Sequence, residues 1–147
     1  MRIYLDACCV NRLTDEQTQS RVRQEAEAIE RILGFVREGR YFWLSSDVLI
    51  DEIERGPQVE RKNENRALLT LSSELIQADT HVFDRAIQLQ AVGYGAFDAL
   101  HLASAEVGGA DVLLTTDDKF LKRASRDEGG PQVPVRNPIS WWKGEKI

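Results

Sequence analysis

The sequence lacks the long apolar runs that membrane proteins carry. No stretch of its 147 residues approaches the roughly 20 consecutive apolar residues that a helix needs to cross a bilayer. At the N-terminus only three apolar residues separate Arg2 from Asp6, so no secretory signal peptide is predicted. We therefore expect a cytoplasmic protein without a membrane partner.

Cysteine is also scarce. The two cysteines, Cys8 and Cys9, are adjacent, and adjacent cysteines rarely satisfy the geometry of a disulfide. The cytosol would keep both as thiols. Thiolate is a soft metal ligand, and no other part of the sequence completes a sulfur site. The sequence therefore predicts buried thiols at the end of a strand.

An excess of basic residues is missing as well. The chain has 24 acidic and 19 basic residues, which gives a formal net charge of −5 at pH 7. A protein that coats nucleic acid would be basic overall, so the charge argues against this class. An enzyme that acts on RNA is compatible with it, because bound metal can neutralise acids and local basic patches can contact phosphate.

Length and composition indicate one globular domain over residues 1–147. Hydrophobic residues make up 42% of the chain and charged residues 29%, within the usual globular range. A chain of this length buries roughly 70% of its unfolded surface, so it needs no disulfide or structural metal to fold.

Short β-prone segments alternate with helical patterns along the chain. We expect β-structure at residues 2–8, 41–45, 111–116 and 133–135, a short segment near 75–76, and helices at 21–37, 59–71, 81–91, 96–107 and 119–126. A further helix, capped by Ser45 or Ser46, should end at Gly56. The alternation predicts an α/β fold in which helices cover both faces of a mainly parallel sheet.

Two of the expected strands end in acids. Asp6 follows the first strand, and Asp117 follows residues 113–116. In open α/β sheets, ligands bind beyond the carboxyl ends of the strands. The alternative for either acid is a role in a solvated loop or as a helix cap. Asp118 illustrates that alternative, since it is expected to cap the helix that starts at Lys119.

Glu52 competes with two neighbouring acids for an inward position. At about 100° per residue, the apolar face of its helix is centred on residues such as Leu49 and Ile53. Asp51 points nearly opposite that face, Glu52 lies roughly 80° from its centre and Glu54 nearer 120°. Glu52 is therefore the acid best placed to reach a buried site.

Asp98 lies in a helix with almost no polar face. An unpaired buried carboxylate costs several kcal/mol, so Asp98 must be hydrogen-bonded, protonated or bound to metal. The alternative is that it caps its own helix after Gly95. His101, one turn later, is expected to be a packed or hydrogen-bonded histidine rather than a metal ligand.

Four acids gathered at one edge of a sheet suit Mg²⁺ or Mn²⁺. These hard ions take oxygen ligands and keep waters and substrate phosphate in their coordination shell. The ion would relieve repulsion among the carboxylates, activate water and stabilise a phosphoryl transition state.

These residues, in this order, resemble the PIN-domain ribonucleases, which include the VapC-like toxins of bacterial toxin–antitoxin pairs. The resemblance runs from the first strand to the strand after Pro131, through the segments Leu5-Asp6, Asp51-Glu52-Ile53, Phe97 to Ala103 and Leu114 to Phe120. It places the family's acidic metal-binding positions and two supporting polar positions on the following residues of this chain: Asp6, Glu52, Asp98 and Asp117, with Asn11 and Thr115 in support.

The resemblance implies a Rossmann-like three-layer α/β/α fold and Mg²⁺- or Mn²⁺-dependent endoribonuclease activity. It also implies a homodimer and, in toxin members, a cognate antitoxin protein. Cys8 and Cys9 depart from it, because many members place a hydroxyl soon after the first acid. Trp141 and Trp142 are not a family signature, and we expect them to close the core or a dimer contact rather than to stack RNA bases. We expect the dimer to use apolar surface around residues 29–36 or at this tryptophan end.

Several basic residues are candidates for holding substrate phosphates near the expected site, with exposed surface charge as the alternative for each: Arg12, Arg55, Arg61 and Lys119. The rival to a nuclease is a PIN-like module that binds nucleic acid or protein and cleaves weakly or not at all. An aspartyl-nucleophile hydrolase is disfavoured, because it needs a second acid at position 8, where this chain has cysteine.

Overall fold

The computed structural model describes residues 1–145, with side chains through residue 144. Its elements, in chain order, are β1 (Arg2–Leu5), α1 (Ala7–Arg12), α2 (Ser20–Arg37), β2 (Phe42–Ser46), α3 (Asp47–Glu54), α4 (Val59–Leu69), β3 (Glu74–Ile76), α5 (Thr80–Ala91), α6 (Ala96–Val107), β4 (Val112–Leu114), α7 (Asp118–Ser125), β5 (Val135–Arg136) and α8 (Pro138–Glu145). No helix in this part of the chain is long and apolar enough to span a membrane.

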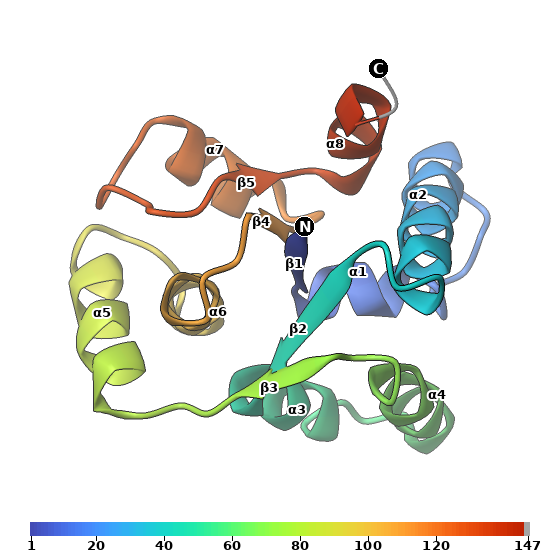
Figure 1. Cartoon of the computed structure of the whole chain (residues 1–147), viewed down its shortest axis with the longest axis horizontal. Coiled ribbons are helices and arrows are strands. Elements are labelled where there is room, and N and C mark those ends of the chain that lie inside the picture. The colour runs from blue at the N-terminus through green and yellow to red at the C-terminus, as the bar shows by residue number, and fades with distance from the viewer. Residues whose placement is uncertain (146–147) are drawn as a thin grey trace.

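The five strands form one parallel sheet in the order β3-β2-β1-β4-β5. The central strand β1 pairs with both neighbours, and Tyr4 lies beside Leu44 on one side and Leu113 on the other. Figure 1 shows α5 and α6 on one side of this sheet and α1, α2 and α4 on the other. The predicted α/β/α architecture with a parallel sheet is confirmed.

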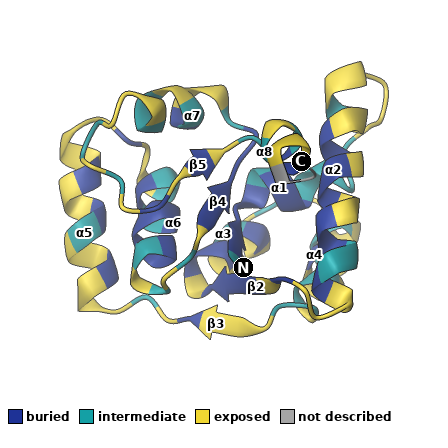
Figure 2. Cartoon of the chain, turned by 45° about the horizontal axis from the view of Figure 1, so that its top comes forward, coloured by how far each residue is buried: buried dark blue, intermediate teal, exposed yellow. Residues whose placement is uncertain are grey.

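Each face of the sheet has its own apolar core, because side chains alternate between faces along a strand. Ile3 and Leu5 of β1 pack with α1, α2, α3 and Trp142 on one face. Tyr4, between them, packs with α5, α6 and α7 on the other. Figure 2 shows the central strands buried, while the outer faces of α2 and α5 are exposed. All strands point the same way, so their carboxyl ends meet at one edge of the sheet.

Two helices were not predicted from the sequence. The first, α1, begins directly after Asp6 and carries both cysteines, which are free thiols. The absence of a disulfide was predicted correctly, but the cysteines lie in a helix rather than at a strand end. The second, α8, places Trp142 in the core with 8% of its surface exposed. The prediction that the tryptophans close the core is therefore confirmed for Trp142.

Candidate active site

Asp6 and Asp117 lie side by side at the carboxyl edge, where β1 and β4 end. The backbone N–H of Asp6 donates to the carbonyl of Leu114, the last residue of β4. Thr115, which is fully buried, connects the two acids. Its hydroxyl lies close enough to Asp6 to lower the pKa of that carboxyl, and the same oxygen accepts the backbone N–H of Asp117 at 3.1 Å. Thr115 therefore lies between the two acids and contacts the backbone of Asp117.

Both acids are also the N-caps of the helices that follow them. The Asp6 carboxylate accepts the backbone N–H of Cys9 at 3.1 Å. The Asp117 carboxylate accepts the N–H groups of Lys119 and Phe120 at 2.9 and 3.3 Å. The capping role and the site position therefore coincide, since a cap at a strand–helix junction lies at the carboxyl edge.

The prediction that Asp118 caps this helix was wrong. Asp118 is already in the first turn of α7, and Asp117 occupies the N-cap. The side chain of Asp118 points outward and binds both terminal nitrogens of Arg21, at 2.7 and 2.8 Å. These bonds lower the pKa of the Asp118 carboxyl.

Glu52 is bound by a buried histidine. The Nε2 atom of His101 lies 2.7 Å from the Oε1 atom of Glu52. On its other side, Nδ1 of His101 lies 2.6 Å from the hydroxyl of Tyr4, which is also 2.6 Å from the hydroxyl of Ser46. Ser46 in turn caps α3, the helix that carries Glu52. Oε2 of Glu52 makes no hydrogen bond within the described residues.

The two acids that compete with Glu52 on α3 face solvent. Glu52 is half-buried, whereas Asp51 and Glu54 are exposed. Asp51 pairs with Arg55 at 3.0 Å, and Glu54 pairs with Arg66. Of these three, only Glu52 contributes to the pKa shifts of the other site acids.

Asp98 is an acid with a strongly raised pKa. It lies in the first turn of α6, is half-buried, and makes no side-chain hydrogen bond within the described residues. Gly95 is the N-cap of this helix, so Asp98 does not cap it. Burial raises the pKa of Asp98 to about 7, and the negative charges of Asp117, Asp6 and Glu52 add to the effect.

The four acids therefore lie close enough for their charges to act on one another. Cys8, on α1, also lies close to these four acids. Burial raises the pKa of its thiol, and the charges of Asp6, Glu52, Asp117 and Asp98 raise it further. A half-buried thiol thus lies beside the acids, where a hydroxyl was expected from the family resemblance.

The remaining candidate residues differ in whether an acid already binds them. Asn11 lines a pocket beside Glu52. Arg12 is bound by Glu25 and Asp15 at 2.8 and 2.7 Å, so its charge is already matched. Lys119, at the start of α7, forms no ion pair within the described residues.

The fold agrees with what comparison with known proteins shows. The sequence profile of the PIN domain matches residues 3–126, most of the chain. The protein belongs to the PIN domain family. PIN domains are generally nucleases that use divalent metal ions.

Solved structures share the PIN fold at low sequence identity. VapBC2 from Rickettsia felis, bound to a DNA fragment from its promoter, has 13% identity and a TM-score of 0.61 over 93% of this chain and 98% of that one. PAE2754 from Pyrobaculum aerophilum has 12% identity and a TM-score of 0.55 over 99% of this chain and 88% of that one. These likenesses show the fold alone. A search among curated proteins finds no match.

The donor chemistry of this PIN domain fits a hard divalent cation. Carboxylate oxygens are the ligands that Mg²⁺ and Mn²⁺ prefer. Burial and the neighbouring carboxylates raise the pKa of Asp98, and a bound cation would offset both effects. Among the side chains described through residue 144, no three acidic, histidine or cysteine groups already form a metal-binding arrangement. Binding of a cation would therefore require these side chains to move closer together.

Proposed function

We propose that the protein is a Mg²⁺- or Mn²⁺-dependent endoribonuclease that hydrolyses phosphodiester bonds in RNA. The observation that carries the proposal is the proximity of four acids at one edge of the sheet: Asp6, Glu52, Asp98 and Asp117. The negative charges of the other three raise the pKa of Asp98, and all four raise the pKa of the Cys8 thiol. Mutual repulsion among four carboxylates destabilises the metal-free fold, and a bound divalent cation would remove that repulsion.

In this proposal the four carboxylates hold the cation, and the surrounding residues fix their orientation. When bound, the cation supplies an activated water and stabilises charge on the phosphoryl oxygens. Thr115 and the N-terminus of α1 hold Asp6, while the N-terminus of α7 holds Asp117. His101 binds Oε1 of Glu52, so Oε2 would be the oxygen available to the cation.

We further propose that the protein is the toxin of a type II toxin–antitoxin pair, with an antitoxin protein as its partner, and that it is a cytoplasmic homodimer. The fold shared with VapBC2 supports the toxin assignment. Most apolar side chains at residues 29–36, together with Trp142, are buried in the core, so this region offers little exposed apolar surface for a dimer. The exposed apolar residues Phe83 and Ile87 on α5 offer a surface instead.

The alternative, a PIN-like binding module with weak or no cleavage, predicts a different result in one experiment. Purified protein is incubated with single-stranded RNA, or with DNA of the same sequence, in the presence of chelator, Mg²⁺ or Mn²⁺. We expect internal cleavage of RNA only with added metal, and its loss in Glu52→Gln but not in Asp51→Asn. Metal-independent binding without cleavage would favour the module, and equal cleavage of DNA would exclude RNA specificity.

A further inference from the structure

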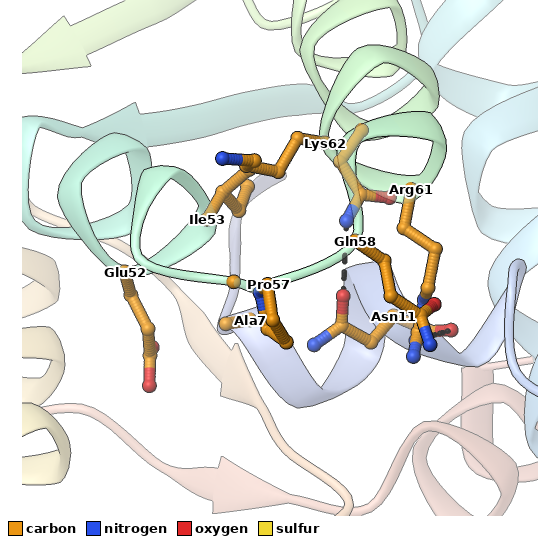
Figure 3. A pocket seen from close by; sticks show the side chains of 10 residues that line it. Ala7, Asn11, Glu52, Ile53, Pro57, Gln58, Arg61 and Lys62 are labelled. Carbon is orange, nitrogen blue, oxygen red and sulfur yellow. Dashed lines mark hydrogen bonds between the residues drawn. The ribbon is translucent and has the colours of Figure 1, made fainter.

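A pocket of about 160 Å³ opens beside Glu52, between α1, α3 and the start of α4. Its polar walls include the amides of Asn11 and Gln58 and the side chain of Lys62, and its apolar part includes Ile53 and Pro57. Figure 3 shows Glu52 on one side of Pro57 and Asn11 on the other. Glu52 thus belongs both to the acid cluster and to the lining of this pocket.

The volume limits what the pocket can hold. At about 30 Å³ per water molecule, it has room for about five waters. Sites for complete small molecules span roughly 300–1,000 Å³, well above this size. The pocket therefore fits one group of a longer ligand whose remainder lies outside.

Asn11 presents a hydrogen-bond donor to this space. The buried side chain of Asn65 donates from Nδ2 to Oδ1 of Asn11 at 2.9 Å, which fixes the orientation of the Asn11 amide. The Nδ2 group of Asn11 makes no hydrogen bond within the described residues. In Figure 3 this nitrogen lies on the side of Asn11 that faces Ala7 and Pro57.

Lys62 supplies a positive charge that is not matched by an acid. Its only hydrogen bond within the described residues runs to the carbonyl oxygen of Glu54 at 3.5 Å, longer than the roughly 2.7–3.2 Å of an ordinary N–H···O bond. Arg61 differs, because Asp15 and Thr14 bind its guanidinium and hold α4 against the segment after α1. Lys62 is therefore available to a ligand, whereas Arg61 has a structural role.

We propose that this Asn11–Lys62 pocket holds the phosphate of the nucleotide next to the cleaved bond in an RNA strand. The inference rests on the proposed ribonuclease function. The free groups are donors, one of them cationic, and Glu52 at the rim is the only acid that lines the pocket in the described chain. Such a set selects an anionic acceptor, and phosphate is the acceptor that recurs along the strand that the acid cluster would cleave.

Phosphate contacts carry a signature that base contacts do not. They act on every sequence alike, and each contact to a single strand contributes about −0.7 to the slope of log affinity against log salt concentration. Loss of Lys62 should therefore weaken binding of all RNA sequences and make the slope less steep by about 0.7.

The test uses the full-length Asp117→Asn protein, which is expected to bind RNA without cleaving it. Its affinity for two unrelated single-stranded RNAs is measured by fluorescence anisotropy across a salt series, with and without Lys62→Ala. Lys143→Ala is the matched control, because Lys143 lies on α8, is exposed and lines neither the pocket nor the acid cluster. Asn11→Ala should also weaken binding, but without changing the slope, since Asn11 is uncharged.

Steady-state cleavage by otherwise wild-type protein gives a second readout. Lys62→Ala should raise KM roughly threefold to tenfold and leave kcat nearly unchanged, since the lost contact lies away from the reacting phosphate. Equal salt slopes with and without Lys62 would overturn the proposal, as would an effect limited to one RNA sequence. A pocket that takes an acidic side chain of a protein partner would give equal slopes. Absence of any metal-dependent cleavage by the wild type would instead refute the ribonuclease function.

Discussion

His101 holds one oxygen of the Glu52 carboxylate, with Nε2 and Oε1 2.7 Å apart. An ionised carboxylate only accepts hydrogen bonds, so Nε2 must carry a proton. Burial raises the pKa of Tyr4, which keeps its hydroxyl protonated and able to donate to Nδ1 of His101. One continuous hydrogen-bonded chain therefore runs from Ser46 through Tyr4 and His101 to Glu52.

Tyr4→Phe should weaken metal binding and RNA cleavage while leaving the fold intact. The substitution keeps the packed ring but removes the hydroxyl that orients His101, so Glu52 loses its fixed position. Groups that orient metal ligands typically contribute 10- to 100-fold to affinity or activity, and we expect roughly tenfold here because His101 itself remains. Mn²⁺ affinity, measured by calorimetry, is the decisive readout. Unchanged Mn²⁺ affinity would show that His101 and Tyr4 only pack the core.

Local patterns in the sequence predicted most of the framework. The helix from Ala96 to Val107 has the predicted bounds, because Gly95 and Gly108 terminate an apolar run on either side. Helical periodicity alone was enough to predict that Glu52, rather than Asp51 or Glu54, points toward the site. In contrast, α1 has six residues, too few for an apolar period to be visible.

Contacts between distant segments were not visible in the sequence. His101 is 97 residues from Tyr4 and 49 from Glu52, so spacing carried no sign that the three side chains meet. The register of the last acid shows another limit. Asp117 and Asp118 are chemically identical, and a pattern cannot decide which of them caps α7. The fold decides, because Thr115 binds the backbone N–H of Asp117 and Arg21 draws Asp118 outward.

Asp117→Asn should abolish cleavage and leave the melting temperature unchanged or higher. Asparagine caps a helix about as well as aspartate, so α7 keeps its N-terminus. The change removes one of four repelling charges and one anionic metal ligand. We expect at least a roughly 100-fold loss of cleavage, measured with Mg²⁺ and with Mn²⁺ beside thermal melts.

Asp118→Asn is the matched control for this substitution. Its side chain is 73% exposed and contacts Arg21 rather than the cluster, so cleavage should remain near the wild-type rate. Equal losses in the two variants would mean that the N-terminus of α7, rather than the Asp117 carboxylate, is what cleavage requires.

The metal-free protein should lose stability as the pH rises from about 4 to about 7. Asp98 has an ordinary pKa of 3.8 when unfolded and about 7 when folded. Between these values the folded state binds the proton more tightly than the unfolded state, so raising the pH favours unfolding. The burial of Asp6 raises its pKa and acts in the same direction. Asp98→Asn should flatten this part of the profile, measured by thermal melts in chelator.

Added Mg²⁺ should reverse the trend, because the ligands must be deprotonated to bind it. The stabilisation by metal should be larger at pH 8 than at pH 5.5. An Asp98→Asn profile as steep as that of the wild type would place the titrating group elsewhere.

Self-association should depend on the outer face of α5. Phe83 and Ile87 are one turn apart and 49% and 63% exposed, which gives this helix an apolar stripe that no described element covers. A few central residues usually carry most of the energy of an interface, so a charge within the stripe should disrupt it. We expect Ile87→Glu to shift a dimer to monomer in sedimentation at micromolar concentration. Val59→Glu is the control, since Val59 is equally exposed at 63% but lies on α4. A wild-type monomer would refute the homodimer, whereas a dimer that survives Ile87→Glu would place its interface on another surface.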